Sequence, residues 1–463
     1  MPNSLDPRFA TDAASSRVGR LLFQRLVDFD DQLRPVPALA SWQQLGERHY
    51  RFVLRPHIPP FHDGSAFTEE DVVATYRSVL QQGSRSPHRA SLGVIERVES
   101  TTDGVIDFLL KQSDPLFPGR LTLGILPRGL AQQSKLVNNQ LIGNGPFAVA
   151  DASRPERLLL ERRSDRQRVE LVRVTDATVR ALKLVRGEID LIQNDLPAEL
   201  IQWLDEQPGI GVTRSPGTNY SYLGFNLQDP VTGDPRVRKA IALAIDRQAI
   251  IDAMFAGAAQ PAESLLPPAH WAGGEGIAAS AHNPAQARLL VSQFVADGGV
   301  AKLTYKTSTD ALRVRIASVI AQQLQTVGFE VDIESHEWGT FYGDIKAGRF
   351  QLYSLAWVGI KMPDIFRYIF HSGSVPPAGA NRGRLQNSRV DALIEQAEVL
   401  PLSEQGEAYR QIQHELAGLR PYVSLWYEGH TVAARQGVSG YSISVDGNYD
   451  GLINVVKRTH VGL

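Results

Sequence analysis

Residues 350–366, FQLYSLAWVGIKMPDIF, place a lysine and an aspartate a few residues after a tryptophan. Apolar and polar side chains alternate at the start of this segment, which predicts a strand that ends near Trp357 and leads into a polar loop. Such a loop could bind a ligand, although most strand ends are simple turns. Lys361 could equally point into solvent, and Asp364 could serve only as the N-cap of the helix that follows.

Aromatic side chains are concentrated around this segment and on strands expected to lie near it. They are Tyr220, Tyr222, Trp338, Phe341, Tyr342, Tyr353, Trp357, Trp426 and Tyr427. Taken singly, each of them is more typical of a hydrophobic core than of a binding site. Together they would suit the lining of a crevice between two α/β lobes, where small organic ligands commonly bind.

Motifs of catalysis, nucleotide binding and metal binding are missing from the sequence. It has no GK[ST] of a P-loop, no HExxH and no GxSxG, and GNGPFA at 143–148 lacks the third glycine of a dinucleotide fingerprint. His57 and His62 flank a Pro-Pro turn, which is more typical of a surface than of a metal site. A carboxylate pair that cleaves a glycosidic bond depends on the fold, so this possibility is left open.

Length and composition limit the classes of protein to consider. With 463 residues the chain is too long for one ordinary hydrophobic core, so two lobes or more are expected. A hydrophobic content of 43%, a charged content of 21% and the absence of cysteine describe a globular protein without disulfides. The net charge of -2 and the scattered arginines leave no basic surface, so no nucleic-acid partner is expected.

The first half of the sequence predicts alternating strands and helices. A helix begins after Thr68, with Asp71 completing a capping box, and a strand is expected at 169–174. Asp176 is the expected N-cap of a further helix, which Gly187 ends before a short strand resumes. Strand, helix and strand in this order predict a βαβ unit, and therefore an α/β fold with largely parallel pairing.

The second half repeats the alternation. A β-prone run at 219–227 is followed by one helix, which begins at Asp234 and Pro235 and continues to residue 251. Helices and strands then alternate as far as the C-terminal section. The chain is therefore expected to form two α/β halves that meet near residues 219–226.

Seven segments of the sequence occur in the order and spacing of a known protein family. They are DGSAFTEEDVVATY, IGNGPF, RVTDATVRALKLVRGEIDL, NYSYLGFNL, DPRVRKAIALAIDRQAI, QLQTVGFEVDIESHEWGTFY and PYVSLWY. With these segments the chain resembles the extracytoplasmic solute-binding proteins of peptide/nickel ABC transporters, family 5, which include the dipeptide- and oligopeptide-binding proteins. The resemblance covers nearly the whole chain.

The resemblance implies an α/β, two-lobed fold of the type II periplasmic-binding-protein kind, with lobes that close over a ligand about a hinge. Lobe one would comprise residues 1–219 and 432–463, including a family-specific subdomain at roughly 30–135, and lobe two residues 226–427. The hinge crossovers would lie at 219–226 and 427–432.

The beginning of the chain, PNSLDPRF, has neither the basic start nor the apolar stretch of a signal peptide, which by itself would indicate the cytoplasm. In the family, however, the corresponding segment follows the first strand of lobe one, which an export signal precedes. We therefore expect that this strand and any signal are missing from the sequence, and that the protein is periplasmic or otherwise extracytoplasmic.

The resemblance also implies a set of ligand-binding residues. Lobe one would contribute Thr11, Asp12 and Ala13, and the other side of the ligand would meet Trp338 and Trp357. The remaining candidates are Tyr222, Asn226, Gly359, Ile360, Lys361 and Asp364.

Two positions depart from the peptide-binding members of the family. Ile360 stands where an aspartate three residues after the tryptophan pairs with the α-amine of the peptide, and Ser354 stands where the oligopeptide binders have an arginine. An isoleucine cannot pair with a buried ammonium group, so both departures weaken the interpretation as a binder of ordinary free peptides. Asp364 is the nearest carboxylate that could replace the lost one.

Arg382 and Arg384 lie in the glycine-rich loop PPAGANRGR, residues 376–384. A guanidinium group binds carboxylates and phosphates, so this loop could receive such a group from the ligand or from the permease. Two surface arginines would equally need no functional explanation.

The interpretation that follows is a non-enzymatic substrate-binding protein of an ABC importer, which captures a peptide or similar polar solute and delivers it to permease subunits. A monomer without a cofactor or metal is expected. Two alternatives are a binding component of a sensor system and, less favoured because no nucleophile and base can be paired, an α/β hydrolase.

Overall fold

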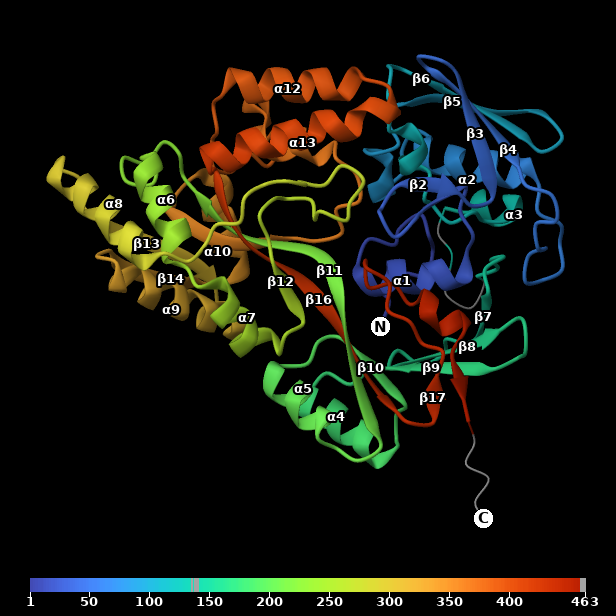
Figure 1. Ribbon diagram of the computed structural model, residues 1–463. Coiled ribbons are helices and arrows are strands. Elements are labelled where there is room, and N and C mark those ends of the chain that lie inside the picture. The colour runs from blue at the N-terminus through green and yellow to red at the C-terminus, as the bar shows by residue number, and fades with distance from the viewer. Residues whose placement is uncertain (135, 137–140, 459–463) are drawn as a thin grey trace. The chain divides into compact units, whose positions relative to one another are not determined.

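The computed structural model of the protein describes residues 1–134, 136 and 141–458 (Figure 1). Contacts divide the chain into two compact units, Met1–Asp190 with Arg435–Leu463, and Leu191–Ala434. Both units mix helices and strands, as the predicted α/β class requires. The expected crossovers at 219–226 and 427–432 fall on two long strands of the second unit, and the expected lobe boundaries stay a prediction.

The first unit contains several small antiparallel sheets. One has the order β3-β4-β6-β5, another β7-β8-β9, and β1 with β2 and β17 with β18 form two-stranded ribbons. The strands are β1 (Val27–Phe29), β2 (Pro35–Pro37), β3 (Ala40–Gly46), β4 (His49–Leu54), β5 (Ile95–Thr102), β6 (Val105–Leu110), β7 (Phe147–Asp151), β8 (Arg157–Arg162), β9 (Arg168–Val172), β17 (Val438–Ser439) and β18 (Val456–Lys457). The helices are α1 (Ala13–Leu22), α2 (Glu69–Leu80), α3 (Arg128–Ala131) and α4 (Ala177–Arg186).

The second unit is built around one seven-stranded sheet with the order β10-β16-β11-β15-β13-β14, to which β12 adds beside β16. Its strands are β10 (Leu191–Gln193), β11 (Ile210–Phe225), β12 (Ala259–Pro261), β13 (Lys302–Ser308), β14 (Glu330–His336), β15 (Leu352–Trp357) and β16 (Tyr422–Arg435). The helices are α5 (Ala198–Asp205), α6 (Pro235–Ala244), α7 (Arg247–Phe255), α8 (Pro284–Ala296), α9 (Ala311–Thr326), α10 (Trp338–Ala347), α11 (Ile365–Phe370), α12 (Ser388–Val399) and α13 (Leu402–Leu419). Figure 1 shows β11 and β16 running side by side.

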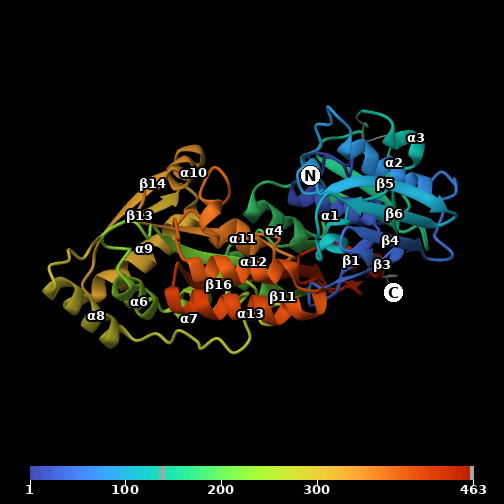
Figure 2. The same ribbon diagram turned by 90° about the horizontal axis from the view of Figure 1, so that it is seen from above.

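Helices cover both faces of this sheet. Successive side chains of a strand point to opposite faces, so Leu223 and Phe225 of β11 join a core with α6 to α9, whereas Tyr220 and Tyr222 join a second core with α10 to α13. Figures 1 and 2 show α12 lying along α13 in this second layer. The second unit is therefore a three-layer structure, and its two cores are separated by the sheet.

Helix starts predicted from capping residues are confirmed. Asp71 accepts a hydrogen bond of 2.8 Å from the backbone N–H of Thr68 at the start of α2, and Asp176 accepts one of 2.8 Å from Val179 at the start of α4. Gly187 follows α4 with a φ of 77°, in the left-handed region that favours glycine.

Two sequence predictions about longer-range organisation are wrong. The βαβ unit does not form, because β9 pairs with β8 while β10 pairs with β16 antiparallel, in another sheet. Among the pairings that the structure describes, the parallel ones are those of β13 with β14 and with β15, so parallel pairing does not dominate. Local alternation predicts that a strand exists, but the partner of the strand depends on distant segments.

The helix predicted from Asp234 to residue 251 is also corrected. It divides into α6 and α7, because Ile245 leaves the helical conformation and Asp246 accepts a hydrogen bond of 3.0 Å from Ala249 as a new N-cap. Over the described part of the chain, none of the helices combines the length and the apolar character that a membrane span requires.

Candidate functional site

A row of aromatic side chains lies on one face of the large sheet in the second unit. Antiparallel pairing of β11 with β15 sets Tyr220 opposite Trp357 and Tyr222 opposite Leu355, so all of these side chains share one face. The row continues through residues from other elements. Its members, called here the aromatic row, are Trp338, Tyr342, Arg382, Trp357, Tyr222 and Tyr422.

Ring contacts connect the aromatic side chains within each half of the aromatic row. Trp338 stacks on Tyr342 with ring centroids 5.4 Å apart, and at the other end Tyr222 stacks on Tyr422 at 4.1 Å. Trp357 and Tyr222 are nearly parallel, with centroids 6.4 Å apart. Trp338, at the start of α10, keeps 55% of its surface exposed, whereas Tyr222 is fully buried. The row therefore extends from solvent into the core.

Arg382 joins the two halves of the aromatic row. Its guanidinium carbon lies 4.6 Å from the ring centroid of Trp357 and 5.4 Å from that of Tyr342. Nη1 donates a hydrogen bond of 2.9 Å to the hydroxyl of Tyr222, and Nη2 donates one of 3.2 Å to the hydroxyl of Tyr342. A cation over an aromatic face is stabilised by about 0.5–2 kcal/mol, more where solvent is excluded.

The backbone around Arg382 is held firmly in place. Asn381, which is 2% exposed, donates to the carbonyls of His371 and Leu385 and accepts from the N–H of Leu385. The backbone oxygen of Gly383 accepts a hydrogen bond from the N–H of Leu227, just after the end of β11. A Cβ added to Gly383 would lie 2.7 Å from the carbonyl oxygen of Phe225, so a larger residue would not fit here without a shift. The loop thus presents Arg382 from a fixed position.

Arg382 remains a cation although only 7% of it is exposed. Burial opposes the charge, but the surrounding tyrosines, Tyr222 first, raise the pKa of the guanidinium above the usual arginine value. The idea of two surface arginines is therefore wrong for Arg382. Arg384 has a different role, because its Nη1 donates to the backbone oxygen of Arg382 and braces the loop.

The loop after Trp357 carries four of the predicted ligand-binding residues. Gly359 has a φ of 72°, which permits the chain to turn away from the strand, and Ile360 packs against the core on the side of α10 to α13. The backbone oxygen of Lys361 lies 3.1 Å from Nε2 of His270, and Lys361 is half-buried. Asp364 occupies the N-cap position of α11, but its side chain makes no capping hydrogen bond.

Asn226 lies apart from this loop. It directly follows Phe225, which pairs with Leu352 at the end of β15 far from Trp357. Its side chain donates hydrogen bonds to the carbonyl oxygens of Gly348 and Phe350. These bonds hold the turn between α10 and β15. The structure thus brings Trp338, Trp357 and Tyr222 together through the aromatic row, and it places Asn226 elsewhere in the second unit.

Thr11, Asp12 and Ala13 belong to the first unit, at the start of α1. Asp12 is the N-cap and accepts a hydrogen bond of 2.9 Å from the backbone N–H of Ser15. Partial burial would raise the pKa of Asp12, but hydrogen bonds from Ser15 outweigh it and lower the pKa below the usual value. Thr11 and Ala13 are exposed, and a ligand-binding role for the three residues stays a prediction.

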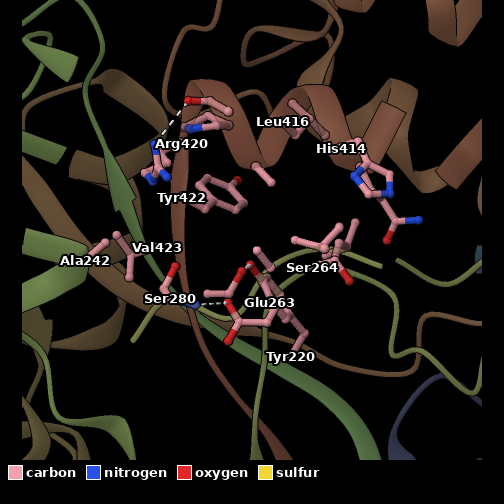
Figure 3. A pocket seen from close by; sticks show the side chains of 18 of the residues that line it. Tyr220, Ala242, Glu263, Ser264, Ser280, His414, Leu416, Arg420, Tyr422 and Val423 are labelled. Carbon is pink, nitrogen blue, oxygen red and sulfur yellow. Dashed lines mark hydrogen bonds between the residues drawn. The ribbon is translucent and has the colours of Figure 1, made fainter. Parts of the chain in front are cut away.

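A cavity of about 270 Å³ lies beside the buried end of the aromatic row (Figure 3). Tyr220 and Tyr422 line it together with residues of α13 and of the segment after β12. Arg247 also lines it, but this guanidinium is paired with Glu263 at 2.7 Å and bonded to the backbone oxygen of Ser280. The charge of Arg247 is thus balanced by a carboxylate, in contrast to that of Arg382.

Sequence reasoning did not connect Tyr342, Arg382 and Tyr422 with one another. The sequence pattern places Tyr342 among other aromatic side chains, Arg382 in a glycine-rich loop and Tyr422 in a predicted strand, and it does not join the three. Arg382 contacts Tyr342 across 40 residues of sequence and Tyr222 across 160, and no short-range spacing signals these contacts. Within the described residues, no group of three or more acidic, histidine or cysteine side chains could hold a metal ion.

Comparisons with known proteins agree with this architecture. Residues 32–376, more than half of the chain, match the family described as bacterial extracellular solute-binding proteins, family 5 Middle. A dipeptide-binding protein of Pseudomonas aeruginosa is 27% identical, over 96% of this chain and 91% of the relative. The ABC transporter substrate-binding protein CtaP of Listeria monocytogenes has a similar structure, with a TM-score of 0.86, 22% identity, and coverage of 99% of this chain and 97% of that one.

Proposed function

The chain belongs to family 5 of the bacterial extracellular solute-binding proteins, and from this premise we propose that its ligand is a peptide or a polar solute of similar size. The protein is the substrate-binding component of an ABC importer, and we propose that it releases this ligand to the membrane permease. We propose that it acts outside the cytoplasm, in the periplasm or another extracytoplasmic location, and as a monomer.

The aromatic row is the observation that carries the proposal within this chain. Aromatic rings present large, rigid surfaces, and a site for a small ligand typically combines them with a few polar groups. Trp338 supplies an exposed ring, and Trp357 lies beside a fixed cation. The similarity to a dipeptide-binding protein supports a peptide as the class of ligand.

Binding without catalysis accounts for the groups in the row. Tyrosine hydroxyls, indole rings and one guanidinium can hold a polar solute, and the contacts among the described residues pair none of them with a base that would make it a nucleophile. A solute that binds one conformation of the protein better than the others draws the population to that conformation. The permease would then recognise the loaded form.

Thermal unfolding with a panel of solutes tests the proposal. Dipeptides, longer peptides, opines and Ni²⁺ complexes are added separately, and a ligand at a hundredfold excess over its Kd should stabilise the folded state by about 2.7 kcal/mol. Stabilisation by a peptide is expected. Turnover in a general esterase or peptidase assay, with no solute raising the melting temperature, would contradict the proposal.

Substitution of Trp357 tests the site. Trp357→Ala should weaken binding of the stabilising solute at least tenfold, because the ring and the contact with Arg382 are lost together. The matched control is Trp42→Ala, which removes a partly buried indole packed on Phe52 in the first unit and should leave affinity unchanged. If both variants bind the solute as tightly as the wild type, Trp357 is not part of the binding site.

A further inference from the structure

Arg382 differs from the other buried arginines of the described chain in what surrounds its charge. Arg8, Arg162 and Arg247 each pair with a carboxylate, from Asp6, Asp165 and Glu263 respectively. Arg238 bonds to three backbone oxygens, those of Thr232, Gly233 and Leu419. The contacts of Arg382 within the described residues are with two tyrosine hydroxyls and two ring faces, and none of them is with a carboxylate.

Such an environment leaves both charge and hydrogen-bonding capacity unused. A guanidinium has five N–H donors, and two hydrogen bonds from Arg382 to side chains are described. Beside it, the indole N–H of Trp357 is buried and has no partner among the described residues. Buried charges and buried donors are normally paired, so these two neighbouring groups call for an acceptor that carries negative charge.

Positive charge also extends along the aromatic row. The ammonium group of Lys346 lies 5.1 Å from the ring centroid of Tyr342, the same ring that faces Arg382. The six members of the row include no carboxylate. An ammonium group of a ligand would therefore be repelled from this place, whereas an anion would be attracted.

We propose that Arg382 binds a carboxylate group of the transported solute, with the indole N–H of Trp357 as a second donor. The planar fork of a guanidinium matches the two oxygens of a carboxylate, and the rings of Trp357 and Tyr342 hold the fork in position. The inference rests on the proposed function, because it names the chemical group by which the same site selects its solute. The row then selects carboxylate-bearing solutes over amides and amines.

A matched set of three probes tests this selectivity. Trialanine, its C-terminal amide and its N-acetyl form have nearly the same size, and they separate the carboxylate from the ammonium group. Isothermal titration of the wild-type protein should show at least tenfold weaker binding of the amide, and a smaller loss for the N-acetyl form. Equal binding of acid and amide would overturn the inference and leave the proposed function standing.

Variants of Arg382 connect the selectivity to this residue. Arg382→Met should bind acid and amide equally, and Arg382→Lys should keep part of the preference because it retains the charge without the fork. The control Arg389→Gln removes one positive charge from an exposed site on α12, where Arg389 pairs with Glu415, and should keep the full preference. A preference for the acid that persists in Arg382→Met would overturn the inference.

A structural role for Arg382 predicts a different result in the absence of solute. Because a buried cation without a counter-charge is costly, Arg382→Met should melt at the same temperature as the wild type or higher. A large fall in the melting temperature of Arg382→Met without solute, together with the full preference for the acid in Arg382→Lys, would mark Arg382 as a structural residue and overturn the inference.

A second probe keeps the two proposals separable if no form of trialanine binds. Sodium hippurate and the uncharged hippuramide are titrated while tryptophan fluorescence is recorded, because a carboxylate on Arg382 would alter the environment of Trp357. A response to hippurate alone, lost in Arg382→Met, would support the carboxylate site although the peptide proposal had failed. No response to either compound would overturn the carboxylate site as well.

Discussion

Two aromatic clusters of this protein contain similar residues but differ in their exposure to solvent and in whether they contain a charge. In the first unit, Tyr50, Phe52, Tyr76, Phe108 and Phe117 pack against one another under the β3-β4-β6-β5 sheet, and all are at most 2% exposed. In the second unit, the aromatic row begins at a Trp338 that is 55% exposed and contains a buried arginine.

The two clusters also differ in where the nearby arginine lies and what pairs with it. Arg51, directly opposite Asp107 on strands β4 and β6, forms two hydrogen bonds of 2.8 Å to that carboxylate, so its charge is balanced within the sheet. Arg382 has rings and hydroxyls around it in place of a carboxylate. Arg51 and Asp107 alternate with the rings along β4 and β6, so this charge pair lies on the face of the sheet away from the first cluster. The rings of the aromatic row instead contact a buried charge that lacks a carboxylate partner, an arrangement suited to a ligand.

The largest effect is expected from a cavity in the first cluster. Phe108→Ala removes a fully buried ring that contacts Phe52, Tyr76 and Phe117, and should lower the free energy of unfolding by about 3–5 kcal/mol. Urea denaturation followed by circular dichroism measures the loss. A change below about 1 kcal/mol would show that this cluster is loosely packed and would remove the contrast with the aromatic row.

A smaller, pH-dependent effect is expected at the paired arginine. The hydrogen bond from Arg51 is the main cause that lowers the pKa of Asp107. The ionised carboxylate therefore stabilises the folded state above the ordinary aspartate pKa. This stabilisation is lost as the pH falls through the lowered pKa. Asp107→Asn should therefore be less stable than the wild type at pH 7, and the difference should narrow as the pH falls below the ordinary aspartate pKa.

The control for this measurement is Asp103→Asn, which changes an exposed carboxylate in the turn between β5 and β6 of the same sheet. Its urea midpoint should stay close to that of the wild type at pH 7 and at pH 3. A gap between Asp107→Asn and the wild type that is as wide at pH 3 as at pH 7 would refute the assigned charge pairing.

The smallest effect on stability is expected at the exposed end of the aromatic row. Trp338→Ala should change the free energy of unfolding by no more than about 0.5 kcal/mol, because more than half of the side chain is already in water. Its affinity for the stabilising solute should nevertheless fall several-fold, as calorimetry would detect. Leu289→Ala, an exposed apolar residue of α8, is the control and should change neither quantity. Unchanged affinity in Trp338→Ala would show that Trp338 does not contact the solute and that only the buried part of the aromatic row binds it.

Local signals in the sequence were sufficient for individual strands and helices. Alternation of side chains predicted the strand that ends at Trp357, and capping residues at Thr68, Asp176 and Asp234 marked the starts of three helices. Each of these signals acts within one turn or one strand, so it survives in the folded protein. The family resemblance, confirmed by the comparisons, supplied the function for the same reason: seven local segments keep their order.

What the sequence determined by itself was therefore the set of elements, the family and the presence of an aromatic loop with nearby arginines. Only the tertiary structure decided that Arg382 lies over Trp357 and bonds to Tyr222, a residue 160 positions earlier in the chain. The pairing of β11 with β15 and the packing of the loop at residue 382 create that contact. Because the partner of a buried charge is chosen by packing between distant segments, spacing along the chain cannot reveal it.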